Sequence, residues 1–580
     1  MLPVYRQLGK NTASQVSNSS SYWSAEICEF LEKIMASDEN IPLKVGLVSL
    51  GCAKNLVDSE IMLGALLKEG VEITNDPDSA DAVIVNTCSF IDSSKEESVD
   101  AILEADAVRE AGNRKQALVV AGCLTQRYGE QLSELIPEVD RFMGIDQVSD
   151  IPRIVREAIS RRDVRLSNPD NSKKRPPRPP RSGGAISGTL NQADKSSPTQ
   201  PPQDKVIEFE KRPKYVPDFA TPRFRLTPRH LAYLKIAEGC NHPCSFCTIP
   251  RMRGSHRSRP QDDVVADARA LVADGVREIN LISQDSTYYG LDLRQDRRGS
   301  ISSPEKFSAA ASALPVGSTT LCTLLRELQS IEGDFWIRLL YTHPAHWTDE
   351  LIQTIAECDK VARYIDIPLQ HIHPVMLERM RRETSKEYIV NLIEKIRAGI
   401  PGIAIRTTFI VGFPGESEEY FEDLLKFVED TRFERLGVFT YSKEEGTPSS
   451  RMANQIHGNT RKRRARQIME TQRKISAEIG QSLVGRTMKV LPEKLATASE
   501  LSLARIQSWE HGHLRENAPD SPAQAHLINE DDLIMVCRGQ ADAPDIDGRI
   551  YVPDDSIQEG DFINVRITGH TDYDLIGEVI

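Results

Sequence analysis

Three cysteines lie within eight positions of the chain, in the stretch GCNHPCSFC. Side chains of this type and spacing could together bind a metal ion or cluster. Cys240, Cys244 and Cys247 are potential thiolate donors, and thiolates in proteins bind zinc or iron–sulfur clusters. A closed zinc site needs four ligands, usually as two close pairs, and no second pair lies nearby in the sequence. We interpret His242 as a solvated loop residue rather than a fourth ligand. Three cysteines on a four-iron cluster would leave one iron open to bind a substrate or cofactor.

The cysteine cluster directly follows the first of six apolar runs that alternate with helical stretches. This β/α alternation predicts a parallel barrel or partial barrel whose active face lies at the carboxyl ends of the strands. Residues 291–320 have low complexity, and we expect them to form a surface insertion. The six predicted strands are residues 231–237, 278–284, 335–341, 364–370, 404–412 and 435–441.

A second set of three cysteines lies nearer the N-terminus. Cys52, Cys88 and Cys123 each follow an apolar run, and the runs alternate with helical stretches as in a parallel α/β sheet. Because the carboxyl ends of parallel strands share one edge, the three thiols are expected to converge there. Three separate core cysteines are the alternative, but their equivalent strand-end positions favour ligation.

Changes in composition and in the pattern of apolar residues divide the 580 residues into several domains. From Gly485, short alternating runs predict a small antiparallel β-barrel with an insert at 495–530. Residues 167–215 are rich in Pro, Ser and Gly and carry 10 Lys or Arg against 5 Asp or Glu. A basic patch for nucleic acid is one interpretation of this segment, but we favour a flexible linker. The expected divisions are a weakly ordered extension at 1–42, an α/β domain at 43–166, the linker at 167–215, a barrel domain at 216–480 and the small β-barrel at 481–580.

The overall charge favours a basic protein as the partner. The formal net charge is -13, and residues 481–580 contain 8 Lys or Arg and 18 Asp or Glu. A surface that bound nucleic-acid phosphates would be basic, so direct nucleic-acid binding is not expected. No apolar run approaches the roughly 20 residues of a membrane span, and no signal peptide is evident, so we expect a cytoplasmic protein. We also expect a monomer. In a reducing compartment, clustered cysteines bind metal or do redox chemistry.

The CxxxCxxC spacing after a strand, with Phe246 before the last cysteine, resembles the radical S-adenosylmethionine enzymes. The resemblance implies that these cysteines hold a 4Fe-4S cluster, whose open iron is chelated by S-adenosylmethionine and which cleaves it to a 5'-deoxyadenosyl radical. The stretch IVGFPGE at 410–416 is similar to that family's glycine-containing motif. Four further residues at strand ends could line the cofactor pocket or be structural, with neither role preferred. With Phe246, the candidate cofactor-binding residues are therefore Gln284, Gln370, Gly412 and Glu416.

The second triad narrows the resemblance to the methylthiotransferases. In that family an N-terminal α/β domain holds a second 4Fe-4S cluster through three strand-end cysteines, and the terminal barrel of this chain is similar to a TRAM domain. SLGCAKNLVDSE resembles the RimO branch, which modifies an aspartate of small-subunit ribosomal protein S-twelve. Members that modify tRNA adenosine typically show GCQMN instead. Ala53 is a departure, since the branch usually has proline there.

The resemblance implies a function and partners, and two alternatives stay open. The radical would remove a hydrogen from the β-carbon of the aspartate, the second cluster would carry the sulfur, and a second S-adenosylmethionine would methylate it. An external electron donor and a sulfur source are implied. The alternatives are a tRNA adenosine methylthiotransferase with the same cofactors and a zinc-stabilised RNA-binding or scaffold protein without catalysis.

The remaining cysteines and two histidines fit no required ligand pattern. His343 and His346 follow the third predicted barrel strand and face the same rim as the cysteine cluster, but the six cysteines already fill both sites. The other cysteines are assigned to packing or to the surface, and they are Cys28, Cys322, Cys358 and Cys537.

Overall fold

The structure is a computed structural model that describes residues 42–167, 190, 207–294, 303–497, 500–501 and 533–580. The chain forms two compact units, one of residues 1–215 with 221–224 and one of residues 216–220 with 225–580. None of the described helices is both long enough and apolar enough to cross a membrane. Cys28 and most of the segments at 1–42, 167–215 and 495–530 lie outside the described residues.

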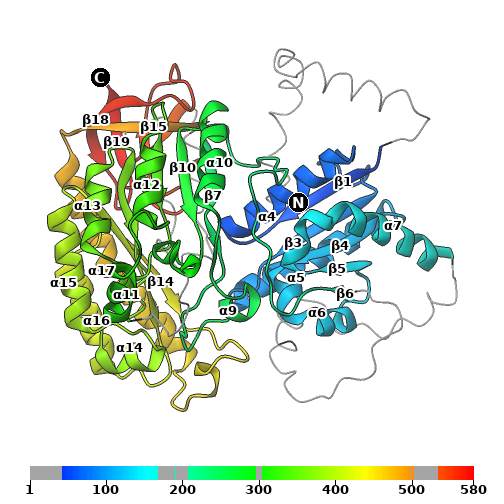
Figure 1. The fold of residues 1–580 in the computed structure, drawn as a ribbon, viewed down its shortest axis with the longest axis horizontal. Helices are drawn as coiled ribbons and strands as arrows, with labels where there is room; N and C mark the ends of the chain where they lie inside the picture. Colours follow the sequence, from blue (N-terminus) through cyan, green and yellow to red (C-terminus); the bar gives the residue numbers. More distant parts are fainter. Residues whose placement is uncertain (1–41, 168–189, 191–206, 295–302, 498–499, 502–532) are drawn as a thin grey trace. The chain divides into compact units, whose positions relative to one another are not determined.

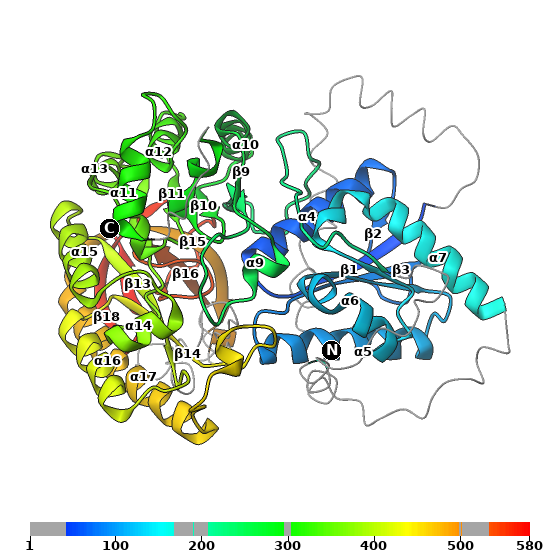
Figure 2. The same cartoon turned by 60° about the horizontal axis from the view of Figure 1, so that its bottom comes forward.

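The first unit contains a six-stranded parallel sheet in the order β2-β1-β3-β4-β5-β6 (Figure 1). The expected parallel α/β fold is therefore confirmed. Every residue of β3 and β4 is buried, which explains their unbroken apolar runs, because both faces are covered. Helices α4 and α7 cover one face, and α5 and α6 cover the other (Figure 2). The strands are β1 (Lys44–Ser49), β2 (Glu72–Ile73), β3 (Ala82–Thr87), β4 (Ala117–Gly122), β5 (Arg141–Met143) and β6 (Ile207–Glu208), and the helices are α4 (Ala53–Lys68), α5 (Asp92–Ala111), α6 (Cys123–Leu135), η1 (Ile145–Asp150) and α7 (Ile151–Ser167).

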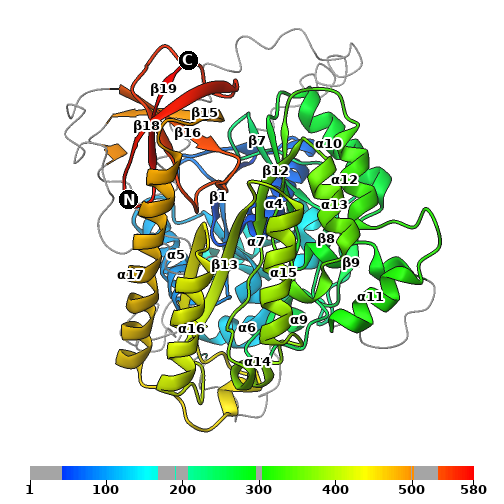
Figure 3. The same ribbon diagram turned by 90° about the vertical axis from the view of Figure 1, so that its left-hand side faces the viewer.

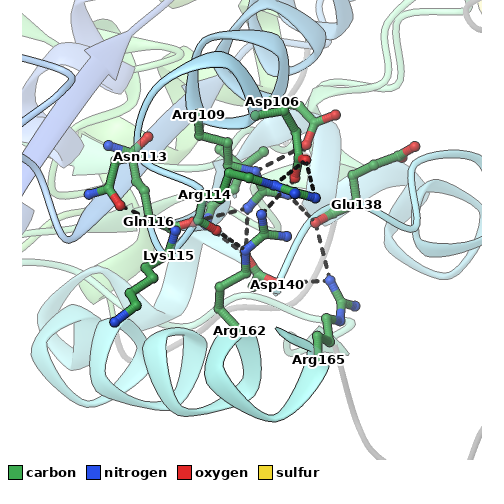
Figure 4. Close-up of polar contacts among 12 residues, drawn as sticks. Asp106, Arg109, Asn113, Arg114, Lys115, Gln116, Glu138, Asp140, Arg162 and Arg165 are labelled. Atoms are coloured by element: carbon green, nitrogen blue, oxygen red, sulfur yellow. Dashed lines mark hydrogen bonds and ion pairs between the residues drawn. The ribbon is translucent and has the colours of Figure 1, made fainter. Parts of the chain in front are cut away.

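A buried ion network closes the amino-terminal edge of this sheet (Figure 4). Arg109, near the end of α5, is 1% exposed and donates to Asp106 Oδ1 at 2.8 Å and to Asp140 Oδ2 at 2.7 Å. The second oxygen of Asp140 accepts from Arg165 of α7. A buried guanidinium with this many partners ties α5, α7 and the start of β5 together.

The second unit contains a six-stranded parallel sheet in the order β14-β13-β12-β11-β10-β7. This confirms the predicted partial barrel, and each of the six predicted strands is present. The helices that follow the strands lie side by side along the outside of the sheet (Figure 3) and enclose a large aliphatic core. The strands are β7 (Leu231–Lys235), β10 (Glu278–Ile282), β11 (Trp336–Leu339), β12 (Val361–Asp366), β13 (Ala404–Val411) and β14 (Arg435–Thr440), with the outer helices α10 (Gln261–Ala273), α12 (Leu321–Gln329), α13 (Asp349–Glu357), α15 (Lys386–Gly399), α16 (Glu418–Thr431) and α17 (Gly458–Leu483).

Several short helices and strands lie in the loops that connect the main elements of this second sheet. The segment at 291–320 contains a helix, α11, whose Phe307 is buried against Tyr288 and Leu291. The loop after β7 carries a two-stranded ribbon, β8 with β9. The short elements are β8 (Ala237–Glu238), α9 (Ile249–Met252), β9 (Arg257–Ser258), η3 (Ser286–Tyr288), η4 (Leu291–Leu293), α11 (Pro304–Ser312), η5 (Pro344–His346), α14 (Pro374–Met380) and η6 (Ser449–Arg451).

The C-terminal part of the second unit is a closed five-stranded barrel in the order β15-β16-β17-β19-β18. This confirms the predicted small barrel, although the pair β17 and β19 is parallel rather than antiparallel. Arg538 of β16 reaches the first residue of β10 and pairs with Glu278 at 2.7 Å, both side chains being buried. The barrel therefore packs under the amino-terminal ends of the parallel strands. Its strands are β15 (Thr487–Thr497), β16 (Leu533–Gly539), β17 (Ile550–Val552), β18 (Ile563–His570) and β19 (Leu575–Val579).

Candidate functional site

The N-terminal cysteines occupy equivalent positions after three adjacent parallel strands. Cys52 caps α4 after β1, Cys88 directly follows β3, and Cys123 begins α6 after β4. The strand order reverses between β1 and β3, and open α/β sheets bind ligands beside such a reversal, at the carboxyl ends of the strands. Burial raises the pKa of Cys88, and the charges of Cys123 and Cys52 raise it further. The structure therefore brings these three thiols, the strand-end triad, to one edge.

Two glycines allow the turns that carry the strand-end triad. Gly51 has a φ of +88° and Gly122 a φ of +94°, a conformation that side chains with a Cβ rarely adopt. A Cβ on Gly51 would lie 2.7 Å from the Cβ of Cys88. The chain can therefore approach Cys88 this closely only because residue 51 has no side chain.

Asn55 links the turns of the strand-end triad and was not identified from the sequence. Its Nδ2 donates to Leu50 O at 3.0 Å and to Thr87 O at 2.8 Å, and its Oδ1 lies 3.6 Å from Cys123 Sγ. The residue is 0% exposed. Its position three residues after Cys52, on the inner side of a buried helix, is a signal that could have identified it.

The second group of cysteines, the loop triad, is Cys240, Cys244 and Cys247, all half-buried. The loop leaves β8, and the Cys240 amide donates to Gly254 O at 3.1 Å while the Cys247 amide donates to Cys244 O at 3.3 Å. Burial raises the pKa of Cys240 well above its usual range, and the charges of Asp285, Cys247 and Cys244 raise it further. These three thiols are therefore close neighbours as well.

Hydrogen-bond donors point at each sulfur of the loop triad. The His242 amide lies 3.5 Å from Cys240 Sγ, and the Ile249 amide lies 3.4 Å from Cys247 Sγ. Arg382 Nη1 lies 3.7 Å from Cys244 Sγ. Donors of this kind stabilise thiolates and tune the potentials of iron–sulfur clusters. Since no described cysteine is in a disulfide, the donor set fits a cluster held by three thiolates.

Three of the residues expected to line the cofactor pocket make structural contacts. Phe246 packs edge-on against Phe413, with ring centroids 6.4 Å apart, in an apolar cluster. Glu416 is buried, and its Oε2 accepts from the amide of Gly412 at 2.5 Å and from Arg464 at 2.6 Å. Gly412 has a φ of +72°. Glu416 therefore fixes the turn after β13.

The two glutamines keep polar groups at the rim of the barrel. Gln284 follows β10 and donates to Glu238 Oε2 at 3.2 Å, while its own Oε1 is buried and has no hydrogen-bond partner among the described residues. Gln370 has a φ of +75°, a strained value for a residue other than glycine. Its backbone amide donates to Thr408 O and its carbonyl accepts from the Ile410 amide, both in β13. These backbone contacts leave its side chain for other contacts.

The prediction that His242 is a solvated loop residue was wrong. The side chain is 7% exposed, and its Nε2 donates to Asp285 Oδ2 at 2.9 Å. His343 and His346 do face the same rim, since both lie beside His242. No role was predicted for Asp285, although it follows a predicted barrel strand just as the cysteines follow theirs.

Three of the four unassigned cysteines are buried in the cores, as expected for packing residues. Cys322 and Cys358 belong to the core of the second sheet, and Cys537 belongs to that of the small barrel.

Comparisons with known proteins divide the chain in the same way as its elements. Residues 44–144 match an uncharacterized protein family, UPF0004, residues 234–428 match the radical SAM superfamily, and residues 524–580 match the TRAM domain. The superfamily match implies a 4Fe-4S cluster and S-adenosylmethionine as cofactors.

Relatives of known name match nearly the whole chain. A ribosomal protein uS12 methylthiotransferase RimO of Opitutus terrae is 48% identical over 92% of this chain and 96% of its own length. A RimO of Akkermansia muciniphila is 44% identical over 93% of this chain and 100% of its own length. Among solved structures, the radical S-adenosylmethionine methyltransferase TsrM of Kitasatospora setae aligns with 83% of this chain and 84% of its own at a TM-score of 0.42 and 14% identity. By its near-complete match to the two RimO proteins, the chain belongs to the RimO family of radical S-adenosylmethionine methylthiotransferases.

Proposed function

We propose that this protein adds a methylthio group to the β-carbon of an aspartate of ribosomal protein uS12. In this proposal Cys240, Cys244 and Cys247 hold one 4Fe-4S cluster, and the strand-end triad holds a second. The observation that carries the proposal is the presence of two cysteine triads in a chain that matches uS12 methylthiotransferases over most of its length. One triad is brought together at a sheet edge and the other in one loop.

The bound clusters and S-adenosylmethionine supply the radical and sulfur chemistry, which is needed because no side-chain base can remove a hydrogen from an unactivated carbon. The residues of the chain bind and orient these groups. The donors of His242, Ile249 and Arg382 offset the negative charge on the loop sulfurs. On the other sheet, Gly51 and Asn55 hold the strand-end turns close together.

Buried surroundings support a reaction that must exclude water. Cys88 and Cys123 are 5% and 6% exposed, and such burial limits side reactions of reactive groups. The proposal requires an external electron donor and a source of sulfur for each turnover.

The charge of the C-terminal barrel supports a basic protein substrate over tRNA. Residues 481–580 carry 8 Lys or Arg and 18 Asp or Glu. In the connection between β17 and β18, Asp555, Glu559 and Asp561 are all exposed. An acidic surface speeds encounters with a basic protein and repels phosphates.

Mass spectrometry of ribosomal protein uS12 and of tRNA nucleosides tests the proposal. Cells that lack the gene, and cells that carry only the Cys244→Ala variant, should lose a mass increment of about 46 Da on uS12, the difference between a methylthio group and a hydrogen. The tRNA nucleosides should be unchanged. Loss of the increment from tRNA alone would assign the enzyme to tRNA and contradict the proposed substrate.

A further inference from the structure

A second group of potential metal ligands lies beside the loop triad. Asp285 Oδ2 is 2.9 Å from His242 Nε2 and 2.9 Å from His346 Nδ1. The three residues come from the cysteine loop, from the end of β10 and from η5. All three side chains are buried, and His343 offers another ring nitrogen nearby. The proposed methyl and sulfur transfers use the backbone amide of His242 but none of these side chains.

In the absence of an ion, the His242 Nε2 proton occupies the contact with Asp285 Oδ2, and an ion bound between these atoms would displace that proton. Metal bonds of about 2.05 Å to histidine nitrogen and carboxylate oxygen separate two ligands by about 2.9 Å when the angle at the metal is about 90°. The observed separations from the Asp285 oxygen are both 2.9 Å. Two histidines and one carboxylate on one face form a donor set that binds divalent transition metals.

The surroundings of Asp285 hold its carboxylate in place. Thr287 Oγ1 donates to the other oxygen, Oδ1, at 2.7 Å. Metal-binding carboxylates are typically oriented in this way by an outer hydrogen bond. Among the described residues, no Lys or Arg forms an ion pair with Asp285. The buried carboxylate is stabilised by hydrogen bonds from His242 and Thr287, and a divalent cation would add a compensating positive charge.

The aromatic side chains around the group close it from solvent. Phe307 of α11 stacks on His346 with ring centroids 4.3 Å apart, and His343 stacks on His242 at 3.6 Å. The Nε2 atom of His343 is buried and has no hydrogen-bond partner among the described residues. An unpartnered polar atom at this position indicates that the cluster has capacity for a further ligand or ion.

We propose that His242, Asp285 and His346 bind one divalent transition metal ion, with nitrogen and oxygen ligands only, as a site separate from the six cysteines. His343 lies beside this site as a further donor. The ion would link the cysteine loop to β10 and η5 and so stiffen the rim on which the loop triad is carried.

Zinc is the probe for this site. The holoprotein, with its clusters filled under anaerobic conditions, would be incubated with zinc(II) and freed of excess ion. Iron and zinc per chain and the zinc K-edge absorption spectrum would then be measured. We expect about one zinc per chain with a shell of nitrogen and oxygen only, and unchanged iron. No retained zinc, or a sulfur shell accompanied by loss of iron, would overturn the proposal.

Two variants and one control connect the zinc to the named residues. His346→Gln removes a ligand outside the cysteine loop. Thr287→Val leaves all the proposed ligands in place but removes the outer hydrogen bond to Asp285 and the acceptor of the His343 amide. We expect Thr287→Val to weaken zinc binding about 10- to 100-fold and His346→Gln to weaken it more, with iron unchanged in both. His373→Gln, which alters a histidine that stacks on Tyr420 instead, should bind zinc as the wild type does. Equal zinc in all four proteins would overturn the assignment.

Discussion

The two cysteine triads reach similar arrangements by different routes. Cys240, Cys244 and Cys247 lie in one loop, so local hydrogen bonds bring them together. Cys52, Cys88 and Cys123 are each more than 30 residues apart in sequence and meet only because β1, β3 and β4 are adjacent and parallel. The loop triad therefore depends on a short motif, whereas the strand-end triad depends on the whole sheet of its unit.

The largest expected effects come from replacing one cysteine of each triad, because the two replacements should abolish different steps of the reaction. Cys244→Ala should abolish both cleavage of S-adenosylmethionine and methylthio transfer, because it removes a proposed ligand of the cluster that binds this cofactor. Cys88→Ala should abolish transfer but retain cleavage. The measurement is release of 5'-deoxyadenosine together with the mass of the ribosomal protein. Retained transfer in Cys88→Ala would show that the strand-end triad has no part in the reaction.

Loss of the buried network in Figure 4 should destabilise the first unit and thereby weaken iron binding by the strand-end triad. Arg109→Met leaves Asp106 and Asp140 buried without their main partner, which should lower the free energy of unfolding of the first unit by about 3–5 kcal/mol. Denaturant titration followed by circular dichroism would measure this change. Iron bound by the loop triad should persist after that of the strand-end triad is lost. Simultaneous loss of all iron would contradict the proposed independence of the two triads.

A smaller effect should come from crowding at the strand-end turn. Gly51→Ala places a Cβ against Cys88 and forces an unfavourable φ, so stability should fall by about 1–3 kcal/mol and the cluster should bind more weakly. Gly70→Ala is the matched control, because Gly70 has a φ of +75° and open space around it. Thermal unfolding and iron content would compare the two variants. Equal losses in both would mean that contact with Cys88 has no specific effect.

The smallest effect should be electrochemical and confined to the loop triad. Arg382→Met removes the guanidinium 3.7 Å from Cys244 Sγ. The reduced cluster, which carries more negative charge, should lose more stabilisation than the oxidised one, so its midpoint potential should become more negative. Redox titration monitored by electron paramagnetic resonance would measure the shift, with the exposed neighbour changed as the control, Arg381→Met. If the midpoint potential changed equally in both variants, Arg382 would have no specific effect on the cluster.

The sequence predicted the sheets well because long apolar runs of β3, β4 and β13 mark buried parallel strands. It did not predict β2, β5 or β6, since two or three residues carry no recognisable period. The triads could be predicted because cysteine is rare and its spacing is visible.

The polar surroundings of the triads could not be predicted in the same way. Asn55 and Arg382 act through contacts with chain segments distant in sequence. The burial of His242 depends on Asp285 and on stacking with His343. Such contacts are set by tertiary packing, so the loop around His242 could not by itself show that the residue is buried.

The most direct test of the account is the iron content of the anaerobically prepared protein and of two triple variants. One variant replaces Cys52, Cys88 and Cys123 by alanine, and the other replaces Cys240, Cys244 and Cys247. Two 4Fe-4S clusters predict about eight iron atoms per chain in the wild type and about four in each variant. A variant that keeps all the iron, or a wild type that binds only about four, would contradict the proposal that each triad holds its own cluster.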